Sequence, residues 1–172
     1  MKIEQTPLKD SFILTPTIFN DERGSFHEAF NDILFKKVSG QKVNFVQDNQ
    51  STSSFGVLRG LHYDDKTWKL ISCPHGKLYL VVLDLREKQP NYGKWESFII
   101  GPETGTQVLI PPGFANGHYV MEDNSIFQYK LAYPGEYYDD DKQGTVFWND
   151  KRFNIDWPTD NPILSKRDKP NK

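Results

Sequence analysis

Four side chains in this chain have the types that acid–base catalysis needs. His62 is available as a general base, and Asp168 as a carboxylate that orients it. Lys69 could hold a developing oxyanion, and Tyr129 could deliver a proton from the far side. Such a set suits removal of a proton from a carbon next to a carbonyl group. The sequence alone does not bring the four together, and three of them also fit purely structural roles: a cap for Asp168, a surface position for Lys69 and a core position for Tyr129.

His62 lies in residues 56–63, a run that is otherwise apolar and β-prone. A buried strand does not carry an Arg and a His unless each has a partner or a task. Arg59 and His62 would point to opposite faces of a regular strand, because an odd number of positions separates them. A bulge or kink at Gly60 would bring them to one side. The alternative is an Arg in solvent at a sheet edge and a hydrogen-bonded core His.

Other chemistries lack their sequence signatures. The histidines, His27, His62, His75 and His118, are scattered singly, whereas metal-binding double-stranded β-helix proteins usually pair two of them with a carboxylate. No Gly-rich turn joins a strand to a helix, so no phosphate or dinucleotide loop is predicted. Cys73 has no base beside it in the sequence. We therefore expect neither a metal nor a cofactor.

Composition indicates one domain and excludes several classes of partner. The chain has 172 residues, enough for one substantial core. Its net charge of −2 argues against binding of nucleic acid. The single Cys73 excludes an intrachain disulfide, and we see no signal-type apolar segment and no run long enough to span a membrane. We expect a cytoplasmic protein with no membrane partner.

Turn residues divide the chain into short β-type segments, which is typical of an antiparallel sandwich or barrel. One helix is predicted over residues 32–38, with Asn31 as its N-cap and a stop at Gly40. Residues 111–113, Pro-Pro-Gly, are predicted to form a type II turn. The acidic run that ends at Asp141 is predicted to be a solvated loop, and residues 148–172 to pack across the sheets. The predicted strands are 12–15, 25–30, 43–49, 56–63, 69–73, 77–84, 95–100, 106–110, 117–121 and 125–131.

A series of short motifs runs through nearly the whole chain in order. They are FNDERG at 19–24, FVQDN at 45–49, VLRGLH at 57–62, KL at 69–70, IPPGFA at 110–115, YK at 129–130, WND at 148–150, WP at 157–158 and LSKRD at 164–168. This series resembles the dTDP-4-dehydrorhamnose 3,5-epimerase family. The resemblance implies an all-β fold, a cupin-type jelly roll or double-stranded antiparallel β-sandwich with a few short helices, as one domain over residues 1–172. It also implies a homodimer that exchanges N-terminal strands.

The activity that the resemblance implies is cofactor-free epimerisation of a nucleotide-diphosphate sugar that carries a 4-keto-6-deoxy ring. His62 would remove a proton from carbon 5 or carbon 3, and Asp168 would fix the tautomer of His62. Lys69 would stabilise the enolate at the 4-keto oxygen, and Tyr129 would return the proton from the opposite face. One preorganised donor to an oxyanion is worth roughly 3–4 kcal/mol. A positioned acid–base group adds on the order of 10² to 10⁴ in rate.

The resemblance also suggests which residues hold the substrate. Arg59 would bind the diphosphate or hold the sugar. Gln47, Asn49, Arg23 and Glu28 would contact the nucleotide or the sugar.

Two departures from the family pattern bear on the substrate. After the Gly-Phe-Ala of residues 113–115 the family usually has His-Gly-Phe, whereas this chain has Asn116 and, two residues later, His118. Both are candidate substrate contacts, and whether His118 replaces the missing His is left open. The loop between His62 and Lys69 is short, and the run LAYPGEY at 131–137 is unusual. These features resemble a branch of the family that acts on GDP-linked 6-deoxy-4-keto-heptoses in bacterial capsule synthesis.

Three interpretations follow. The first is an epimerase for a GDP-6-deoxy-4-keto-heptose, which we expect. The second is the same chemistry on a dTDP-hexose, at carbon 3 alone or at both carbons. The third belongs to another class: a cupin sugar-binding module without turnover.

Overall fold

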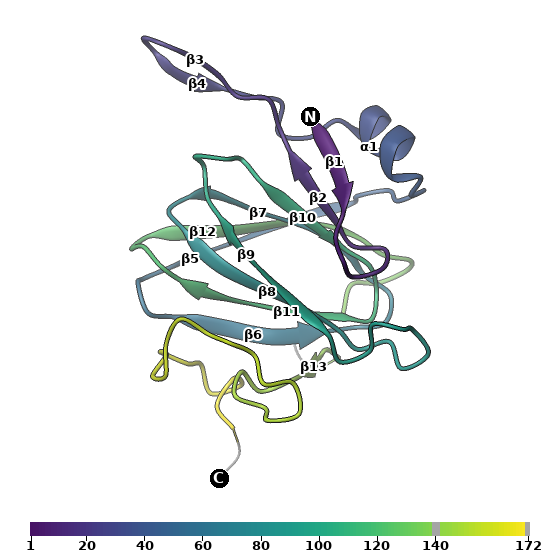
Figure 1. The fold of residues 1–172 in the computed structure, drawn as a ribbon, viewed down its shortest axis with the longest axis vertical. Coiled ribbons are helices and arrows are strands. Elements are labelled where there is room, and N and C mark those ends of the chain that lie inside the picture. The colour runs from purple at the N-terminus through teal and green to yellow at the C-terminus, as the bar shows by residue number, and fades with distance from the viewer. Residues whose placement is uncertain (139–141, 171–172) are drawn as a thin grey trace.

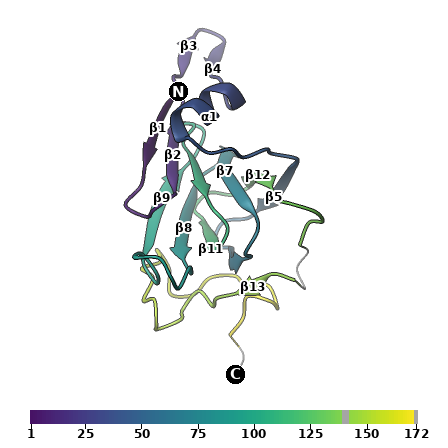
Figure 2. The same cartoon turned by 90° about the vertical axis from the view of Figure 1, so that its right-hand side faces the viewer.

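Two antiparallel β-sheets face each other in the computed structural model, which describes residues 1–138 and 142–170 (Figures 1 and 2). The order of one sheet is β1-β2-β10-β7-β12-β5, and that of the other is β13-β6-β11-β8-β9. The first sheet comprises β1 (Lys2–Gln5), β2 (Phe12–Thr15), β10 (Gln107–Ile110), β7 (Trp68–His75), β12 (Ser125–Ala132) and β5 (Gln47–Ser53). The second comprises β13 (Gly144–Thr145), β6 (Leu58–Tyr63), β11 (Phe114–Val120), β8 (Leu78–Asp84) and β9 (Trp95–Ile100). The prediction of an all-β sandwich is confirmed.

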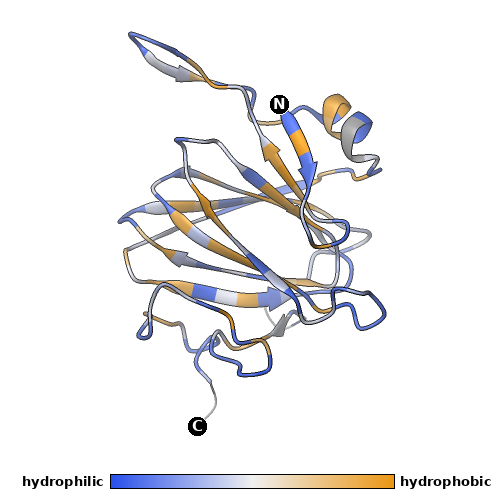
Figure 3. Cartoon of the chain, in the orientation of Figure 1, coloured by the Kyte–Doolittle hydropathy of each residue, from blue (hydrophilic) through white to orange (hydrophobic). Residues whose placement is uncertain are grey.

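The core lies between the two sheets and is built from the strands that the sequence marks as most apolar. Figure 3 shows apolar residues concentrated along the strands and polar residues in the connecting loops. Ile71 of β7, Leu80 and Val82 of β8 and Val108 of β10 are fully buried there. Cys73 is buried in the same cluster, and burial raises the pKa of its thiol to about 11. It is therefore a packing residue rather than a nucleophile.

Helix α1 (Asp32–Ser39) confirms the predicted helix. The Asn31 side chain accepts a hydrogen bond of 3.0 Å from the backbone N–H of Leu34, as an N-cap does. Gly40 ends the helix in the left-handed conformation, with φ of 69°. Phe35 is fully buried, and its ring lies 5.8 Å from that of Phe45. This aromatic contact docks the helix beside the six-stranded sheet.

A hairpin of β3 (Phe19–Asp21) and β4 (Gly24–Phe26) projects away from the sandwich, at the end opposite the C-terminal segment (Figures 1 and 2). Phe19 and Phe26 pair across it and are 63% and 72% exposed. The predicted strand over 25–30 was wrong beyond Phe26, because the chain leaves the two-stranded ladder there and turns toward the helix. Among the described residues, no third strand pairs with this hairpin.

Other strand boundaries differ from the sequence-based prediction. β5 begins at Gln47 rather than at residue 43 and continues past the predicted end at residue 49 to Ser53, because it pairs with β12 over that whole length. β7 likewise continues to His75, where Gly76 with φ of 77° makes the turn. β1, β3 and β13 were not predicted, since none of them is marked by an apolar alternation. The type II turn is supported: Gly113 has φ of 82°, and Phe114 N–H donates to the carbonyl of Pro111.

The C-terminal segment packs against the outer face of the five-stranded sheet (Figure 1). Trp157 is buried there, and its indole N–H donates to the carbonyl of Trp148 at 2.8 Å. Ile163 forms a parallel bridge with Val57, just before β6. Because of this bridge, the residues that follow Ile163, up to Asp168, lie close to β6. The acidic residues 139–141 lie outside the described residues.

Candidate active site

A β-bulge in β6 sets the geometry of the site. Arg59 pairs with His118 and His62 with Asn116, so three steps along β6 face two steps along β11. Gly60 lies in this irregularity with φ of 109°, and a Cβ there would approach the carbonyl oxygen of Asn116 to 2.7 Å. In a regular strand Arg59 and His62 would point to opposite faces. The extra residue of the bulge turns them to the same face, and both line the same cavity. The proposed bulge at Gly60 is thus confirmed.

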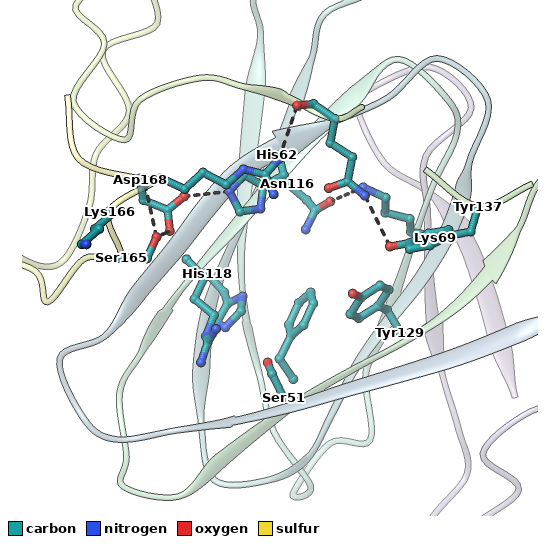
Figure 4. A pocket seen from close by; sticks show the side chains of 14 residues that line it. Ser51, His62, Lys69, Asn116, His118, Tyr129, Tyr137, Ser165, Lys166 and Asp168 are labelled. Atoms are coloured by element: carbon teal, nitrogen blue, oxygen red, sulfur yellow. Dashed lines mark hydrogen bonds and ion pairs between the residues drawn. The ribbon is translucent and has the colours of Figure 1, made fainter. Parts of the chain in front are cut away.

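The cavity has a volume of about 470 Å³ and opens between the sheets and the C-terminal segment (Figure 4). It contains most of the residues that the sequence suggested, drawn from strands of both sheets and from the tail. The lining residues are Ser51, Arg59, His62, Lys69, Asn116, His118, Phe127, Tyr129, Tyr137, Gln143, Ser165, Lys166, Arg167 and Asp168.

His62 and Asp168 form a hydrogen-bonded pair. Nε2 of His62 lies 2.7 Å from Oδ1 of Asp168, and Ser165 Oγ donates to Oδ2 at 2.8 Å. Burial by itself would raise the pKa of Asp168, but the hydrogen bonds from His62 and Ser165 outweigh it and lower that pKa. An ionised carboxylate only accepts hydrogen bonds, so Nε2 of His62 carries its proton. Nδ1 is then the free acceptor, as a general base requires.

Lys69, from β7, is buried in the cavity with a side chain only 7% exposed. Its Nζ donates to Oδ1 of Asn116 at 3.1 Å and lies 3.8 Å from Oδ2 of Asp64. Burial lowers the pKa of Lys69, Asp64 opposes that shift, and Arg167 adds to it. A nearly dehydrated ammonium is a strong partner for a developing oxyanion, because little water screens it.

Tyr129, from β12, reaches the cavity across from the His62–Asp168 pair (Figure 4). Its hydroxyl accepts a hydrogen bond of 3.3 Å from Asn49, whose amide oxygen in turn accepts one from Gln47 at 2.9 Å. Gln47 and Asn49 therefore stand behind Tyr129 rather than in the cavity lining. Tyr137 lies close by, and its pKa is raised by burial and by the neighbouring Tyr129.

His118 is almost fully buried and stacks on Phe127, with ring centroids 4.1 Å apart and an interplanar angle of 12°. Burial, with smaller contributions from the nearby Arg59 and His62, lowers its pKa to about 3. Its Nε2 has no hydrogen-bond partner among the described residues. The lowered pKa favours the neutral form of His118, which is a polar group in the cavity wall.

Positive charge lines the cavity rim. Arg59 donates from Nε to Ser53 Oγ at 3.0 Å, and Arg167 donates to Thr145 Oγ1 at 3.3 Å. Lys166 is exposed next to Arg167. Such a rim suits a doubly charged group such as a diphosphate.

Two predicted substrate contacts do not reach this cavity. Arg23 lies on the projecting hairpin, where its guanidinium is paired with the carboxylate of Asp21. Glu28 lies beyond the hairpin and accepts a hydrogen bond of 3.0 Å from Asn31. Neither side chain lines the cavity of its own chain, and the hairpin that carries Arg23 points away from the sandwich (Figure 1). Within one chain, the structure therefore does not place Arg23 and Glu28 where they could contact a substrate in this cavity.

Reasoning from sequence missed several lining residues: Ser51, Phe127, Tyr137, Gln143, Ser165, Lys166 and Arg167. Ser165, Lys166 and Arg167 precede Asp168 in one motif, so their adjacency was the available signal. Tyr137 ends the unusual run LAYPGEY, which was a signal for it, whereas Gln143 carries no comparable pattern. Asp64 was missed because a single Asp after a strand reads as an ordinary turn residue.

Nothing in residues 1–138 and 142–170 groups three or more His, Cys, Asp or Glu side chains in a way that could hold a metal ion. Within the same residues, no helix is long and apolar enough to cross a membrane.

A jelly-roll sandwich with a histidine–aspartate pair, a lysine and a tyrosine around one cavity defines a cupin-type protein built for acid–base chemistry. The family model described as dTDP-4-dehydrorhamnose 3,5-epimerase matches residues 5–172. The chain belongs to this family, and it is an isomerase of the nucleotide-sugar epimerase type.

Individual relatives agree with this assignment. The chain is 41% identical over 171 residues to the dTDP-4-dehydrorhamnose 3,5-epimerase of Shigella flexneri, covering 98% of this chain and 93% of that protein. It is similar to the crystal structure of the enzyme of that name from Elizabethkingia anophelis, with 40% identity, a TM-score of 0.89 and coverage of 98% and 93%. The dTDP-6-deoxy-D-glucose-3,5-epimerase of Legionella pneumophila, solved in complex with dTDP-4-keto-L-rhamnose, is 36% identical, with a TM-score of 0.90 and coverage of 97% and 89%.

Proposed function

We propose that this chain inverts carbon 3, carbon 5 or both of a dTDP-linked 4-keto-6-deoxy-hexose. The observation that carries the proposal is the hydrogen-bonded pair His62–Asp168 in one cavity with Lys69 and Tyr129. The relatives described above are named for dTDP sugars, which supports the dTDP-hexose over the GDP-heptose that the sequence suggested.

In the first step His62 removes a proton from the carbon next to the ketone. The electron pair of the broken C–H bond forms a carbon–carbon double bond, and the carbonyl becomes an enolate oxyanion. Lys69 stabilises that oxyanion from its dry position, where one preorganised donor is worth roughly 3–4 kcal/mol. Asp168 holds the imidazole in the required tautomer and balances the imidazolium that forms.

In the second step the enolate collapses back to the ketone and takes a proton from the Tyr129 hydroxyl on the opposite face. The configuration at that carbon is thereby inverted. The proton on His62 leaves to solvent, and the phenolate of Tyr129 takes one from solvent, so no net proton is consumed. Asn49 donates to the oxygen of Tyr129 and is placed to stabilise the phenolate.

The cationic rim holds the diphosphate in this proposal. Arg59 binds from one side, and Lys166 and Arg167 bind from the C-terminal segment. Anchoring a remote charged group fixes the sugar ring against His62, and positioning of this kind lowers the barrier of the chemical step. Which carbon reacts then depends on how the ring lies between His62 and Tyr129.

A GDP-linked 6-deoxy-4-keto-heptose is the second candidate substrate. The observation that favours it is His118 in the cavity wall, whose Nε2 has no hydrogen-bond partner among the described residues and can hydrogen-bond an additional sugar hydroxyl. The two candidates require the same chemistry from His62, Lys69, Tyr129 and Asp168.

We also propose a homodimer in which the N-terminal segment of one chain reaches the partner. The support is the projecting hairpin. Its Phe19 and Phe26 are exposed, and its Arg23 lies outside the cavity of its own chain. Light scattering after size-exclusion chromatography is expected to give twice the chain mass. A monomer that is fully active would contradict this arrangement.

The test of the function is incorporation of deuterium from deuterated water. The enzyme is incubated with the dTDP-linked 4-keto-6-deoxy-hexose and, separately, with the GDP-linked 4-keto-6-deoxy-heptose. Label at carbon 3, carbon 5 or both of one sugar, lost in His62→Ala, supports both the chemistry and that substrate. Absence of label in both sugars contradicts the proposed epimerisation of these substrates and favours a binding module.

A further inference from the structure

Asp64 is a buried carboxylate directly behind the cavity lysine, and the proposed reaction gives it no role. It follows β6 in the short connection to β7, and its side chain is only 1% exposed. Oδ1 accepts hydrogen bonds from the backbone N–H groups of Lys66, at 3.1 Å, and Thr67, at 2.7 Å. Oδ2 has no hydrogen-bond partner among the described residues. Its nearest cation is the Nζ of Lys69, 3.8 Å away.

The two carboxylate oxygens of Asp64 therefore have different roles. Oδ1 closes a local turn of the kind that aspartate and asparagine form equally well. Oδ2 contributes only its charge, because no donor lies within hydrogen-bond reach. A buried charge without a partner costs free energy, so Lys69 and Asp64 each depend on the other for compensation.

Lys69 needs such a partner, since its other neighbours do not supply a free negative charge. Asn116 is a neutral acceptor, and Arg167 repels the ammonium. Asp168 is already engaged by His62 and Ser165. The titratable or charged groups around Lys69 are Arg59 and His62 on β6, Asp64 on the connection, His118 on β11, Tyr129 on β12, Tyr137 after it, and Lys166, Arg167 and Asp168 on the C-terminal segment.

We propose that Asp64 is a positioning residue that keeps the Lys69 ammonium charged and aimed at the enolate oxygen. Asp64 acts through Lys69 and does not touch the substrate. This role rests on the proposed function insofar as Lys69 stabilises an enolate. The coupling between the two side chains is a property of the protein alone and is measured without substrate.

The substitution Asp64→Asn isolates the charge. The amide oxygen of Asn can still accept from the N–H groups of Lys66 and Thr67, so the turn is retained. Only the negative charge near Lys69 is lost. Asp65→Asn is the matched control, because Asp65 is adjacent and exposed and removes the same formal charge from the chain.

The first measurement is an NMR titration of the Lys69 side chain in protein labelled with ¹³C and ¹⁵N at lysine, with Lys69→Arg used to assign the signal. An opposite charge within about 4–6 Å shifts a pKa by roughly 1–3 units. We expect the pKa of Lys69 to fall by at least about one unit in Asp64→Asn and to stay within a few tenths in Asp65→Asn. An unchanged pKa of Lys69 in a folded Asp64→Asn protein overturns the proposal.

The second measurement is the pH dependence of kcat with the sugar that takes up deuterium. Loss of the Asp64 charge is expected to move the alkaline limb of the profile to lower pH, because Lys69 then loses its proton earlier. A purely structural role for Asp64 would lower kcat at every pH, leave the limb in place and leave the pKa of Lys69 unchanged, and that combination overturns the proposal. Should Asp64→Asn not fold, Asp64→Ser, which keeps a side-chain acceptor for the turn, replaces it in both measurements.

The two measurements separate the proposals. If the pKa of Lys69 falls in Asp64→Asn while the activity profile does not move, Asp64 controls Lys69 but Lys69 does not stabilise the enolate. That result contradicts the proposed function of Lys69 and leaves the coupling intact.

Discussion

His62 and Asp168 are 106 positions apart in the chain, and their side chains meet at 2.7 Å. His62 comes from β6, inside the sandwich, whereas Asp168 arrives on the C-terminal segment that crosses the outer face of the same sheet. Ser165 binds the second carboxylate oxygen and also accepts from the backbone N–H of Asp168, at 3.2 Å. The orientation of the proposed base therefore depends on the docking of the tail.

Asp168→Asn is expected to reduce kcat by about 10² to 10⁴, because the neutral amide no longer enforces the tautomer of His62 or balances its positive form. The KM is expected to change only a few-fold, since Asp168 is buried behind His62. Steady-state kinetics give both constants. Ser165→Ala removes the hydrogen bond to the carboxylate and the one from the backbone N–H of Asp168 but keeps the charge of Asp168, so a loss as large as that of Asp168→Asn would contradict this account.

Tyr129→Phe is expected to separate exchange from inversion. His62 and Lys69 remain, so the enolate still forms and deuterium still enters the substrate. Without the hydroxyl on the opposite face the proton returns from the side of His62, and inverted product falls by about 10² or more. NMR of the sugar distinguishes label from configuration. Tyr79→Phe, which removes a hydroxyl that bonds Asp156 outside the cavity, should leave both quantities unchanged.

We expect His118 to make the protein less stable in acid. Its folded-state pKa of about 3 lies below the ordinary value of 6.5, so between these values the unfolded chain binds a proton that the folded one does not. The contribution of His118 to the free energy of unfolding is therefore greatest above pH 6.5. It decreases as the pH drops, by up to about 1.4 kcal/mol per pH unit. Urea unfolding at several pH values from 7 to 4 measures the slope.

His118→Phe keeps the stack on Phe127 and removes the titrating group. The stability of this variant should depend less steeply on pH between 6.5 and 4 than that of the original chain. His75→Gln changes an exposed histidine and serves as the control. Equal slopes for His118→Phe and the original protein would mean that His118 is not the source of the acid sensitivity.

Gly60→Ala tests the bulge. A methyl group there would meet the carbonyl oxygen of Asn116 and the Cα of Gly117, each at 2.7 Å, in a backbone conformation with positive φ. We expect the free energy of unfolding to fall by more than about 2 kcal/mol, from overpacking and backbone strain together. Gly135→Ala, where φ is 68° but the space is open, should cost only about 1 kcal/mol. Similar losses in urea unfolding for the two variants would contradict a tight contact at Gly60.

Local signals in the sequence were sufficient where a few neighbouring residues decide the structure. Asn31 caps the helix by a bond to a residue three positions away, and Pro112 with Gly113 makes a turn within four residues. The core strands were also predicted from local sequence, because their residues are mostly apolar. Strand ends were less certain, because β5 and β7 stop where their partners stop rather than where their own pattern changes.

The sequence by itself determined an all-β chain, its family and the residue types available for proton transfer. Only the tertiary structure decided that Asp168 reaches His62, that the bulge at Gly60 turns Arg59 and His62 to one cavity, and that Asp64 lies behind Lys69. It also decided that Arg23 stays outside the cavity of its own chain. The physical reason is that these relationships depend on strand register and on long-range packing, to which residues far apart in the chain contribute together, whereas caps, turns and hydropathy act over a few residues.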